Sequence, residues 1–579
     1  MTQFREPFFQ SHLQKIGLCL RFRAAKIFAM TPLKNFCAST AGEIILAAIF
    51  LFAATGRSEI ATTVARPQFT ATVVNLTNFG GIGDGQTLNT AAVEKALAAL
   101  ADKGGGELVV PPGIWLTGPI KLRSHINLQL ERGALIQFSR DYHLYPLTVI
   151  DLKGEKEVDS TSPISGENLE SVAITGEGII DGGGDAWRPL KKGKLSEGDW
   201  KSLLKSGGVL DEKGATWWPS RAAMAGEKLV EKLRKENSLK PADYEPAHQF
   251  LRPKMLRLIG CKKVLLEGVT FQNPPNWTMN PVLCEDVSIL NVNVHNLPTA
   301  QNSDALDLES CRRAVIRGCT FDTGDDGICI KSGKDAPGRR IGVPCEDVLV
   351  EGCTVYHAHG GFTIGSEMSG GVRNFRVDNC TFIGTDIGLR FKSTRGRGGV
   401  VEKIYISNIR MMDIVSDAIN FNLYYGGKSP LDETAGNAET NLPPVTEATP
   451  QFRDIHIENV VCRGAQKAIV LQGLPEMPIQ NISLKSVSIT AQGGVFVTDA
   501  AGIEFENTEI INRSGAVLNF FRAKNTVVDR LHYPAGAKAV AEVNGSGTGG
   551  IVIKNTDLML AQTNFISSEL PAGSVFEVK

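Results

Sequence analysis

The chain has 579 residues, a formal net charge of −1 at pH 7, 60 glycines and an aromatic content of 7%. The near-neutral charge, with no long basic run in the body of the chain, argues against a nucleic-acid partner. Abundant glycine with few aromatic residues favours a turn-rich β architecture over a helical one.

The first 61 residues are expected to form a leader segment. Residues 42–56 (GEIILAAIFLFAATG) form an apolar run that is too short to span a bilayer comfortably. Lys34 precedes this run and small residues follow it, an order typical of a secretory signal that could start at Met30. A membrane anchor is the alternative. The sequence therefore predicts a secreted or periplasmic protein without stable membrane association once the signal is removed.

Residues 83–115 predict a turn, a helix and a strand. Asn89 or Thr90 can cap the helix at its start, and the glycines at 104–106 can end it. We expect this helix to cover the first coil of the repeat structure described next, where strand edges would otherwise remain unpaired.

One eight-residue pattern recurs from about residue 172 onward. Its copies are residues 264–271, 287–294, 314–321, 348–355, 375–382, 404–411, 455–462, 482–489 and 503–510. Each copy has apolar residues at positions 1, 3 and 8 and Gly, Asn or Ser at position 5, and position 6 is apolar in all copies except the last, where it is Thr508. Apolar alternation predicts a strand, and the turn-forming residue at a fixed offset predicts a corner.

A second short strand follows most copies of this pattern. The segments are residues 305–309, 327–331, 361–365, 388–392, 418–422 and 468–472, with mostly large apolar residues at their second and fourth positions. Two short strands per repeat without helical periodicity predict an all-β fold, a parallel β-helix. We expect one such domain over residues 70–579, interrupted by an insertion at about 185–250.

The cysteines fit this architecture as core residues. Cys319, Cys353 and Cys380 all occupy position 6 of the pattern and should stack inside the coils. The nine cysteines beyond the leader are odd in number and show no CxxC pairing, which argues against a zinc site or a full disulfide framework.

Aligning the coils brings polar residues into adjacent columns on one outer strip. The first column holds Ser303, Asp325, His359 and Asp386, the next holds Asp304 and Asp326, and Arg390 and Lys392 occupy the third and fifth positions of their strand. Parallel coils lie about 4.8 Å apart, so these side chains should cluster. The direction in which Asp304 and Asp326 point stays open, because both stand where a turn becomes a strand.

This strip suits glycoside hydrolysis, which needs one protonated and one ionised carboxyl beside the scissile bond. Crowded carboxylates raise one another's pKa, so one of them can retain its proton. The neighbouring cations suit a sugar polymer that carries carboxylates. A solvated turn at Asp325–Asp326 and a Ca²⁺ site are the alternatives. The adjoining His, Arg and Lys argue against calcium, and we expect no cofactor or metal.

These residues resemble the polygalacturonases, the pectin-hydrolysing glycoside hydrolase family 28. The family pattern is matched in order by Asn302-Ser303-Asp304, Asp325-Asp326, Ala358-His359-Gly360 and Arg390-Phe391-Lys392, with Ser in place of Thr and Ala in place of the first Gly. The resemblance implies a right-handed parallel β-helix and hydrolysis with inversion. It also implies that Asp325 is the general acid, that Asp304 and Asp326 activate water, and that His359 tunes the acid.

The same resemblance implies that Arg390 and Lys392 bind the galacturonate carboxylate. Asn302 and Tyr424 complete the expected substrate-binding set, and Tyr425, also one coil past the cations, is a further candidate. The partner is then a pectic polysaccharide or oligogalacturonide, with homogalacturonan, xylogalacturonan and rhamnogalacturonan all open. A Ca²⁺-dependent pectate lyase and a non-enzymatic β-helix adhesin are the rival functions.

Aromatic residues near the strip leave two questions open. The insertion carries Trp187, Trp200, Trp217 and Trp218 together with a charged helical stretch at 226–237. It is either a surface decoration or a wall at one end of the groove whose tryptophans stack on sugar, which would favour exo cleavage. Trp277 is either a core or a subsite residue.

Overall fold

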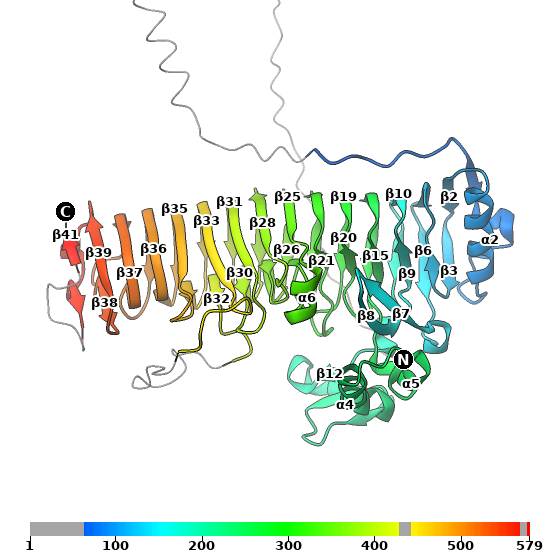
Figure 1. Ribbon diagram of the computed structural model, residues 1–579, viewed down its shortest axis with the longest axis horizontal. Helices are drawn as coiled ribbons and strands as arrows, with labels where there is room; N and C mark the ends of the chain where they lie inside the picture. The colour runs from blue at the N-terminus through cyan, green and yellow to red at the C-terminus, as the bar shows by residue number, and fades with distance from the viewer. Residues whose placement is uncertain (1–62, 428–441, 568–575, 579) are drawn as a thin grey trace, which may run out of the picture. The chain divides into compact units, whose positions relative to one another are not determined.

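The computed structural model describes residues 63–427, 442–567 and 576–578, so the predicted leader lies outside the described residues. Thirty-six strands of the described chain form one sheet (Figure 1). Strand β16 (Lys262–Glu267) pairs in parallel with β10 (Glu170–Gly176) of the preceding coil and with β19 (Glu285–Leu290) of the following one. The predicted fold class, a right-handed parallel β-helix, is confirmed.

The corners of the coils lie where the repeat pattern predicted them. The position-5 residues Gly268, Asn291 and Gly318 have φ angles of 79°, 52° and 64°. Only Gly, and to a lesser degree Asn and Asp, adopts this left-handed conformation readily. The sequence signature of the repeat is therefore a backbone requirement at the bend between two strands.

The inward positions of the coils form one continuous apolar core. Phe391 and Phe421 on successive coils stack with ring centroids 4.1 Å apart. Cys319, Cys353 and Cys380 are buried as predicted, and the nine cysteines of the described chain are free thiols. Adjacent coils thus bury the same kind of side chain at equivalent positions, which fixes the register between their strands.

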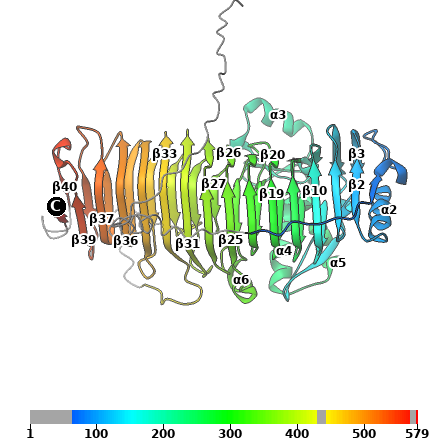
Figure 2. The ribbon, with the colours of Figure 1, turned by 90° about the horizontal axis from the view of Figure 1, so that it is seen from above.

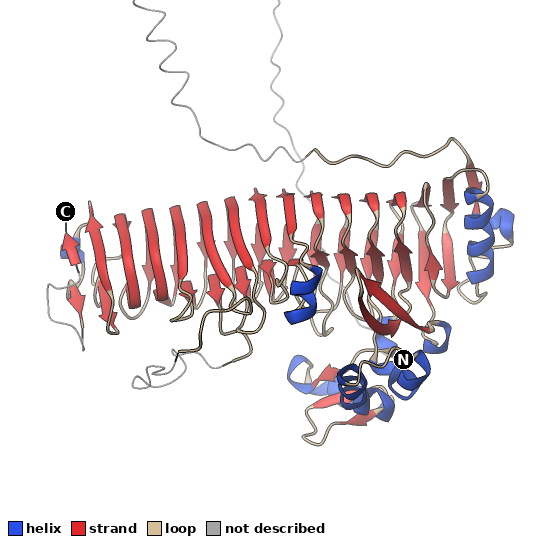
Figure 3. Ribbon diagram, viewed as in Figure 1, coloured by secondary structure: helices blue, strands red, loops and turns tan. Residues whose placement is uncertain are grey.

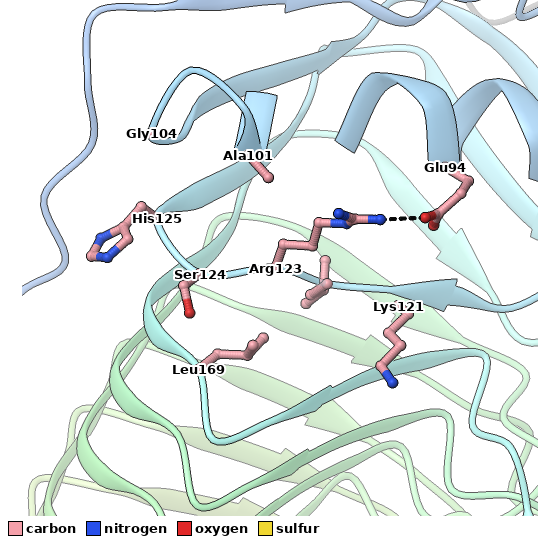
Figure 4. Close-up of a pocket in the computed structure, with 9 residues that line it drawn as sticks. Glu94, Ala101, Gly104, Lys121, Arg123, Ser124, His125 and Leu169 are labelled. Carbon is pink, nitrogen blue, oxygen red and sulfur yellow. Dashed lines mark hydrogen bonds and ion pairs between the residues drawn. The ribbon is translucent and has the colours of Figure 1, made fainter. Parts of the chain in front are cut away.

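Helix α2 (Thr90–Ala101) covers the first coil and buries Val93, Leu97 and Leu100 against it (Figure 1). Asn89 precedes the helix as expected, but its side chain accepts a hydrogen bond from the Ile82 backbone N–H instead of capping the helix. A hollow under this helix is crossed by an ion pair between Arg123 and Glu94 (Figure 4). It lies at the capped end of the solenoid and contains none of the predicted site residues.

Two excursions leave the coils before the predicted site. The hairpin β7–β8 (Leu147–Leu152 and Glu155–Ser160) is antiparallel. The insertion runs from β11 (Ile179–Asp181) to β15 (Leu256–Ile259), somewhat longer than predicted.

The insertion contains three α-helices and a small antiparallel sheet (Figures 2 and 3). They are α3 (Glu197–Lys205), α4 (Arg221–Lys235), α5 (Pro241–Tyr244), β12 (Leu190–Lys191), β13 (Val209–Leu210) and β14 (Thr216–Trp218).

Helix α4 includes most of the predicted helical stretch and anchors the insertion. Val230 and Leu233 of α4 pack with Tyr244 of α5 and with Val158 and Leu147 of the hairpin. The insertion therefore has its own apolar contact with the β7–β8 hairpin. Among the described residues, no helix is both long and apolar enough to cross a membrane.

Candidate active site

The predicted strip forms on four successive strands. They are β21 (Leu306–Glu309), β24 (Ile328–Lys331), β27 (Gly360–Ile364) and β30 (Ile387–Lys392). Their register aligns Asp307, Cys329, Thr363 and Arg390 in one column, which confirms the predicted alignment of the coils. Because the register is common to all four strands, the turns that precede them also stack.

Asp326 is the buried ionised carboxylate of the strip. Its side chain is 1% exposed, and its oxygens accept hydrogen bonds from Arg390 Nη1 at 3.1 Å and from Lys392 Nζ at 2.5 Å. Burial alone would raise the pKa of Asp326, but Lys392, Arg390 and Lys331 hold it well below its usual range. This arrangement answers the open question of direction: Asp326 points outward, toward the two cations.

Asp325 forms a hydrogen-bonded pair with the imidazole of the next coil. Its Oδ1 lies 3.0 Å from His359 Nδ1, and its Oδ2 accepts the Asn302 backbone N–H at 3.3 Å. Burial would raise the pKa of Asp325, but the hydrogen bond and charge of His359 and the charge of Lys392 together lower it. The His359 and Asp325 side chains are 33% and 18% exposed, so solvent reaches this pair.

Asp304 is the carboxyl whose environment favours the protonated form. It is buried, and its Oδ1 accepts no hydrogen bond from the described residues. Burial, together with the negative charges of Asp307 and Asp325, raises its pKa well above the usual value. The expectation that crowded carboxylates retain a proton therefore holds for Asp304. It does not hold within the Asp325–Asp326 pair, because each member of that pair has its own cationic or imidazole partner.

A second buried ionic group lies beside the strip. Lys331 Nζ is 3.0 Å from Glu367 Oε2 and 3.5 Å from Asp307 Oδ1. Burial raises the pKa of Asp307 to about 8, against the opposing charge of Lys331. The same ammonium lies 4.7 Å from the centre of the Trp277 ring, which is half-buried. Trp277 therefore lies beside the buried ionic group on the outside of the coils and is not part of the apolar core.

The tyrosine expectation requires a correction. Tyr424 is only 6% exposed and packs in the core cluster, with Arg395 over its ring at 5.4 Å. Tyr425 instead lies against the site cations, with its ring 5.2 Å from Lys392 Nζ and 5.7 Å from the Arg390 guanidinium carbon. The reason is local: β32 (Asp417–Asn422) ends just before them, and a turn held by the Asn422 side chain breaks the strand alternation.

The insertion reaches the site, so the interpretation as a mere surface decoration is wrong. Lys194 Nζ lies 3.3 Å from His359 Nε2 and 3.2 Å from the Gly324 carbonyl oxygen. Arg252, at the end of the insertion, donates a hydrogen bond to Asn302 Oδ1 at 2.8 Å. Burial and the neighbouring Arg188 lower the pKa of Arg252 to about 10, which leaves it cationic at neutral pH.

The idea that the insertion's tryptophans stack on sugar is not supported. Trp187, Trp200 and Trp217 are buried, and the half-buried Trp218 packs near Phe250, with ring centroids 6.4 Å apart. They hold the insertion together, and cations supply its contacts with the site. Sequence reasoning missed Lys194 and Arg252, because neither belongs to the repeat frame that located the other residues.

The acidic residues of the site do not form an obvious cation cage. In the described part of the chain, oxygen or sulfur atoms of Asp304, Asp326 and Cys329 converge to within 4.8 Å. However, Lys392 and Arg390 already neutralise Asp326, and a thiol suits hard cations poorly. Asp304, Asp326 and Cys329 therefore fit a carboxylate held by two cationic side chains better than they fit a Ca²⁺ site.

Comparisons with known proteins identify relatives that are similar in sequence and in structure. A 28% identical relative is "Probable polygalacturonase" of Vitis vinifera, aligned over 72% of this chain and 74% of that protein. "Exo-poly-alpha-D-galacturonosidase" of Dickeya chrysanthemi is 27% identical over 81% of this chain and 75% of its own length. The solved structure of a hyperthermoactive exopolygalacturonase from Thermotoga maritima is 32% identical, covers 79% of this chain and 95% of its own, and superposes with a TM-score of 0.66.

The family model described as glycosyl hydrolases family 28 matches residues 200–502, a segment that contains the whole strip from Asn302 to Lys392. The match also includes most of the insertion and the coil of Tyr425. The chain therefore belongs to glycosyl hydrolase family 28.

Proposed function

We propose that this glycoside hydrolase cleaves the α-1,4-galacturonosyl linkages of pectin with inversion, acting from a chain end. The observation that carries the proposal is the arrangement of the strip, in which Asp304, Asp325 and Asp326 lie beside two cations. Asp304 has a raised pKa and Asp325 is paired with His359, so these two carboxyls can supply acid–base chemistry. Arg390 and Lys392, which contact the ionised Asp326, suit a sugar carboxylate.

The roles follow the family resemblance. Asp325 protonates the leaving oxygen with His359 as its hydrogen-bond partner, and Asp304 and Asp326 activate the attacking water. In the unliganded protein the proton is favoured on Asp304 and not on Asp325. We infer that a galacturonate carboxylate bound to Arg390 and Lys392 offsets the positive charge that now lowers the pKa of Asp325. A proton shift from Asp304 to Asp325 on binding would then prepare both groups.

The chain-end mode is supported by the insertion. Lys194 and Arg252 bring its positive charge to the groove beside His359 and Asn302. A wall of cations at one side of the scissile bond would stop a polymer there and hold its terminal carboxylate. The Dickeya and Thermotoga relatives are both named as exo-acting enzymes.

Secretion is part of the same proposal. A polymeric pectic substrate is met outside the cell, and the apolar run at 42–56 has the order of an export signal. This segment lies outside the described residues. The length of the protein recovered from culture medium, compared with that in cells, tests whether the leader is removed.

Product analysis tests the function. We expect monomeric or short galacturonate products from the first minutes of polygalacturonate digestion, and NMR should show the β anomer forming first. Asp325→Asn should lose this activity while it remains folded, and Asp102→Asn on the exposed surface of the cap is the matched control. An initial ladder of oligomers would contradict exo action. Unsaturated uronate products, or loss of activity with EDTA, would favour the lyase alternative.

The same assay on xylogalacturonan and rhamnogalacturonan defines the substrate. A preference for polygalacturonate is expected, because Arg390 and Lys392 form one carboxylate site beside the catalytic groups. A clear preference for either of the other polymers would place the enzyme in another specificity class of the same family.

A further inference from the structure

The insertion delivers a lysine to the imidazole of the active site. We propose that Lys194 is a positioning residue that keeps His359 neutral and directs its Nδ1 proton toward Asp325. This inference rests on the proposed function, in which Asp325 is the acid.

The first argument is hydrogen-bond chemistry. Lys194 ends the short helix η4 (Lys192–Lys194), and its Nζ is 3.3 Å from His359 Nε2. An ammonium group offers donors only, so the ring nitrogen that it contacts must accept and cannot carry a hydrogen. The ring hydrogen then resides on Nδ1, which donates to Asp325 Oδ1 at 3.0 Å. One contact therefore sets the tautomer seen by the acid.

The second argument is the balance of charge around the imidazole. Asp325 lies at Nδ1, Asp386 Oδ2 lies 3.8 Å from Nε2, and Arg390 Nη1 lies 3.3 Å from the His359 carbonyl oxygen. The two carboxylates favour an imidazolium, and the ammonium of Lys194 opposes it. An imidazolium would stabilise the ionised form of Asp325 and so withhold the proton that the reaction needs.

The third argument is the anchoring of the lysine. Its Nζ also donates to the carbonyl oxygen of Gly324, in the turn that carries Asp325 and Asp326. That turn is closely packed: a Cβ on Gly324 would lie 2.6 Å from the Ala300 carbonyl oxygen. The ammonium therefore bridges the turn and the imidazole ring.

The lysine is distinct from its neighbours on the insertion. Lys191 and Lys192 are exposed, whereas Lys194 is half-buried. Lys192→Met removes the same charge from the same short helix without touching His359, so it is a matched control for Lys194→Met.

The kinetic test uses the full chain and polygalacturonate. For Lys194→Met we expect kcat to fall about ten-fold at mildly acidic pH, less than the roughly 10²–10⁴-fold that a general acid–base group itself contributes, because Lys194 acts through His359. KM should change less than two-fold. The acid limb of the kcat profile should move to higher pH, because the cation that opposes a positive charge on the imidazole ring is lost. Lys194→Arg should recover much of the loss, and Lys192→Met should match the wild type.

A rise in KM with an unchanged kcat and acid limb would overturn the proposal, because it would make Lys194 a simple substrate ligand. Behaviour equal to that of Lys192→Met would overturn it as well.

The spectroscopic test needs no substrate. In ¹⁵N NMR spectra, with the His359 signals assigned by their loss in His359→Gln, the wild type should show the Nδ1–H tautomer at neutral pH. Lys194→Met should show a mixture or imidazolium. An unchanged tautomer would overturn the proposal even if the activity fell. A wild type that fails to hydrolyse pectin would refute the proposed function and leave this measurement valid.

Discussion

Asp307→Asn offers a direct measure of how the buried charges at the site are balanced. Asp307 is fully buried, neither of its oxygens accepts a hydrogen bond from the described residues, and its nearest cation, Lys331, is also engaged by Glu367. Burial raises its pKa to about 8, whereas an aspartate in an unfolded chain titrates near pH 3.9.

The sign of the effect follows from this raised pKa. Between about pH 4 and pH 8 the folded protein binds a proton at Asp307 that the unfolded chain has lost, so stability falls as pH rises. Each pH unit costs up to about 1.4 kcal/mol. From pH 5 to pH 7, Asp307 should therefore remove about 2–3 kcal/mol of stability from the wild type. Asn at this position does not titrate, so Asp307→Asn should gain that amount relative to the wild type.

The measurement is denaturant unfolding of both proteins at pH 5, 6 and 7, followed by tryptophan fluorescence. The difference between variant and wild type at each pH cancels the titration of groups that do not interact with Asp307. Asp102→Asn, on the exposed surface of the cap, should give a difference that does not vary with pH. A flat difference for Asp307→Asn would refute the reasoning, because it would mean that Lys331 suffices to keep Asp307 ionised in the folded protein.

Two further predictions concern the cations of the site. Lys392→Met should lower the free energy of unfolding by about 3 kcal/mol, because it leaves the buried Asp326 carboxylate short of a partner. Adding Asp326→Asn to this variant should recover part of the loss. If the effects of the two substitutions on denaturant unfolding simply add, the pairing is contradicted. Tyr425→Ala should raise KM about two- to five-fold through loss of the ring beside Arg390 and Lys392. Tyr424→Phe should leave KM unchanged, and equal effects of the two tyrosine variants would show that the exposure of Tyr425 does not matter.

The sequence by itself determined the coil and the order of residues along the strip. Position 5 of the repeat must adopt a left-handed backbone, and alternate positions must be apolar, so the register of each coil can be read without coordinates. Once the register is known, Asp325 and His359 must stack, as must Arg390 and Thr363. In a repeating backbone, residues at the same position of successive coils therefore lie next to each other in space.

The tertiary structure decided the contacts of the residues that lie outside the repeat pattern. Lys194 meets His359 across 165 residues of sequence, from an insertion whose path depends on its own packing against the β7–β8 hairpin. Tyr425 replaces Tyr424 because a turn after β32 breaks the alternation. The raised pKa of Asp304 likewise follows from its burial and from the charges of Asp307 and Asp325 nearby, and these are properties of the surroundings and not of the residue.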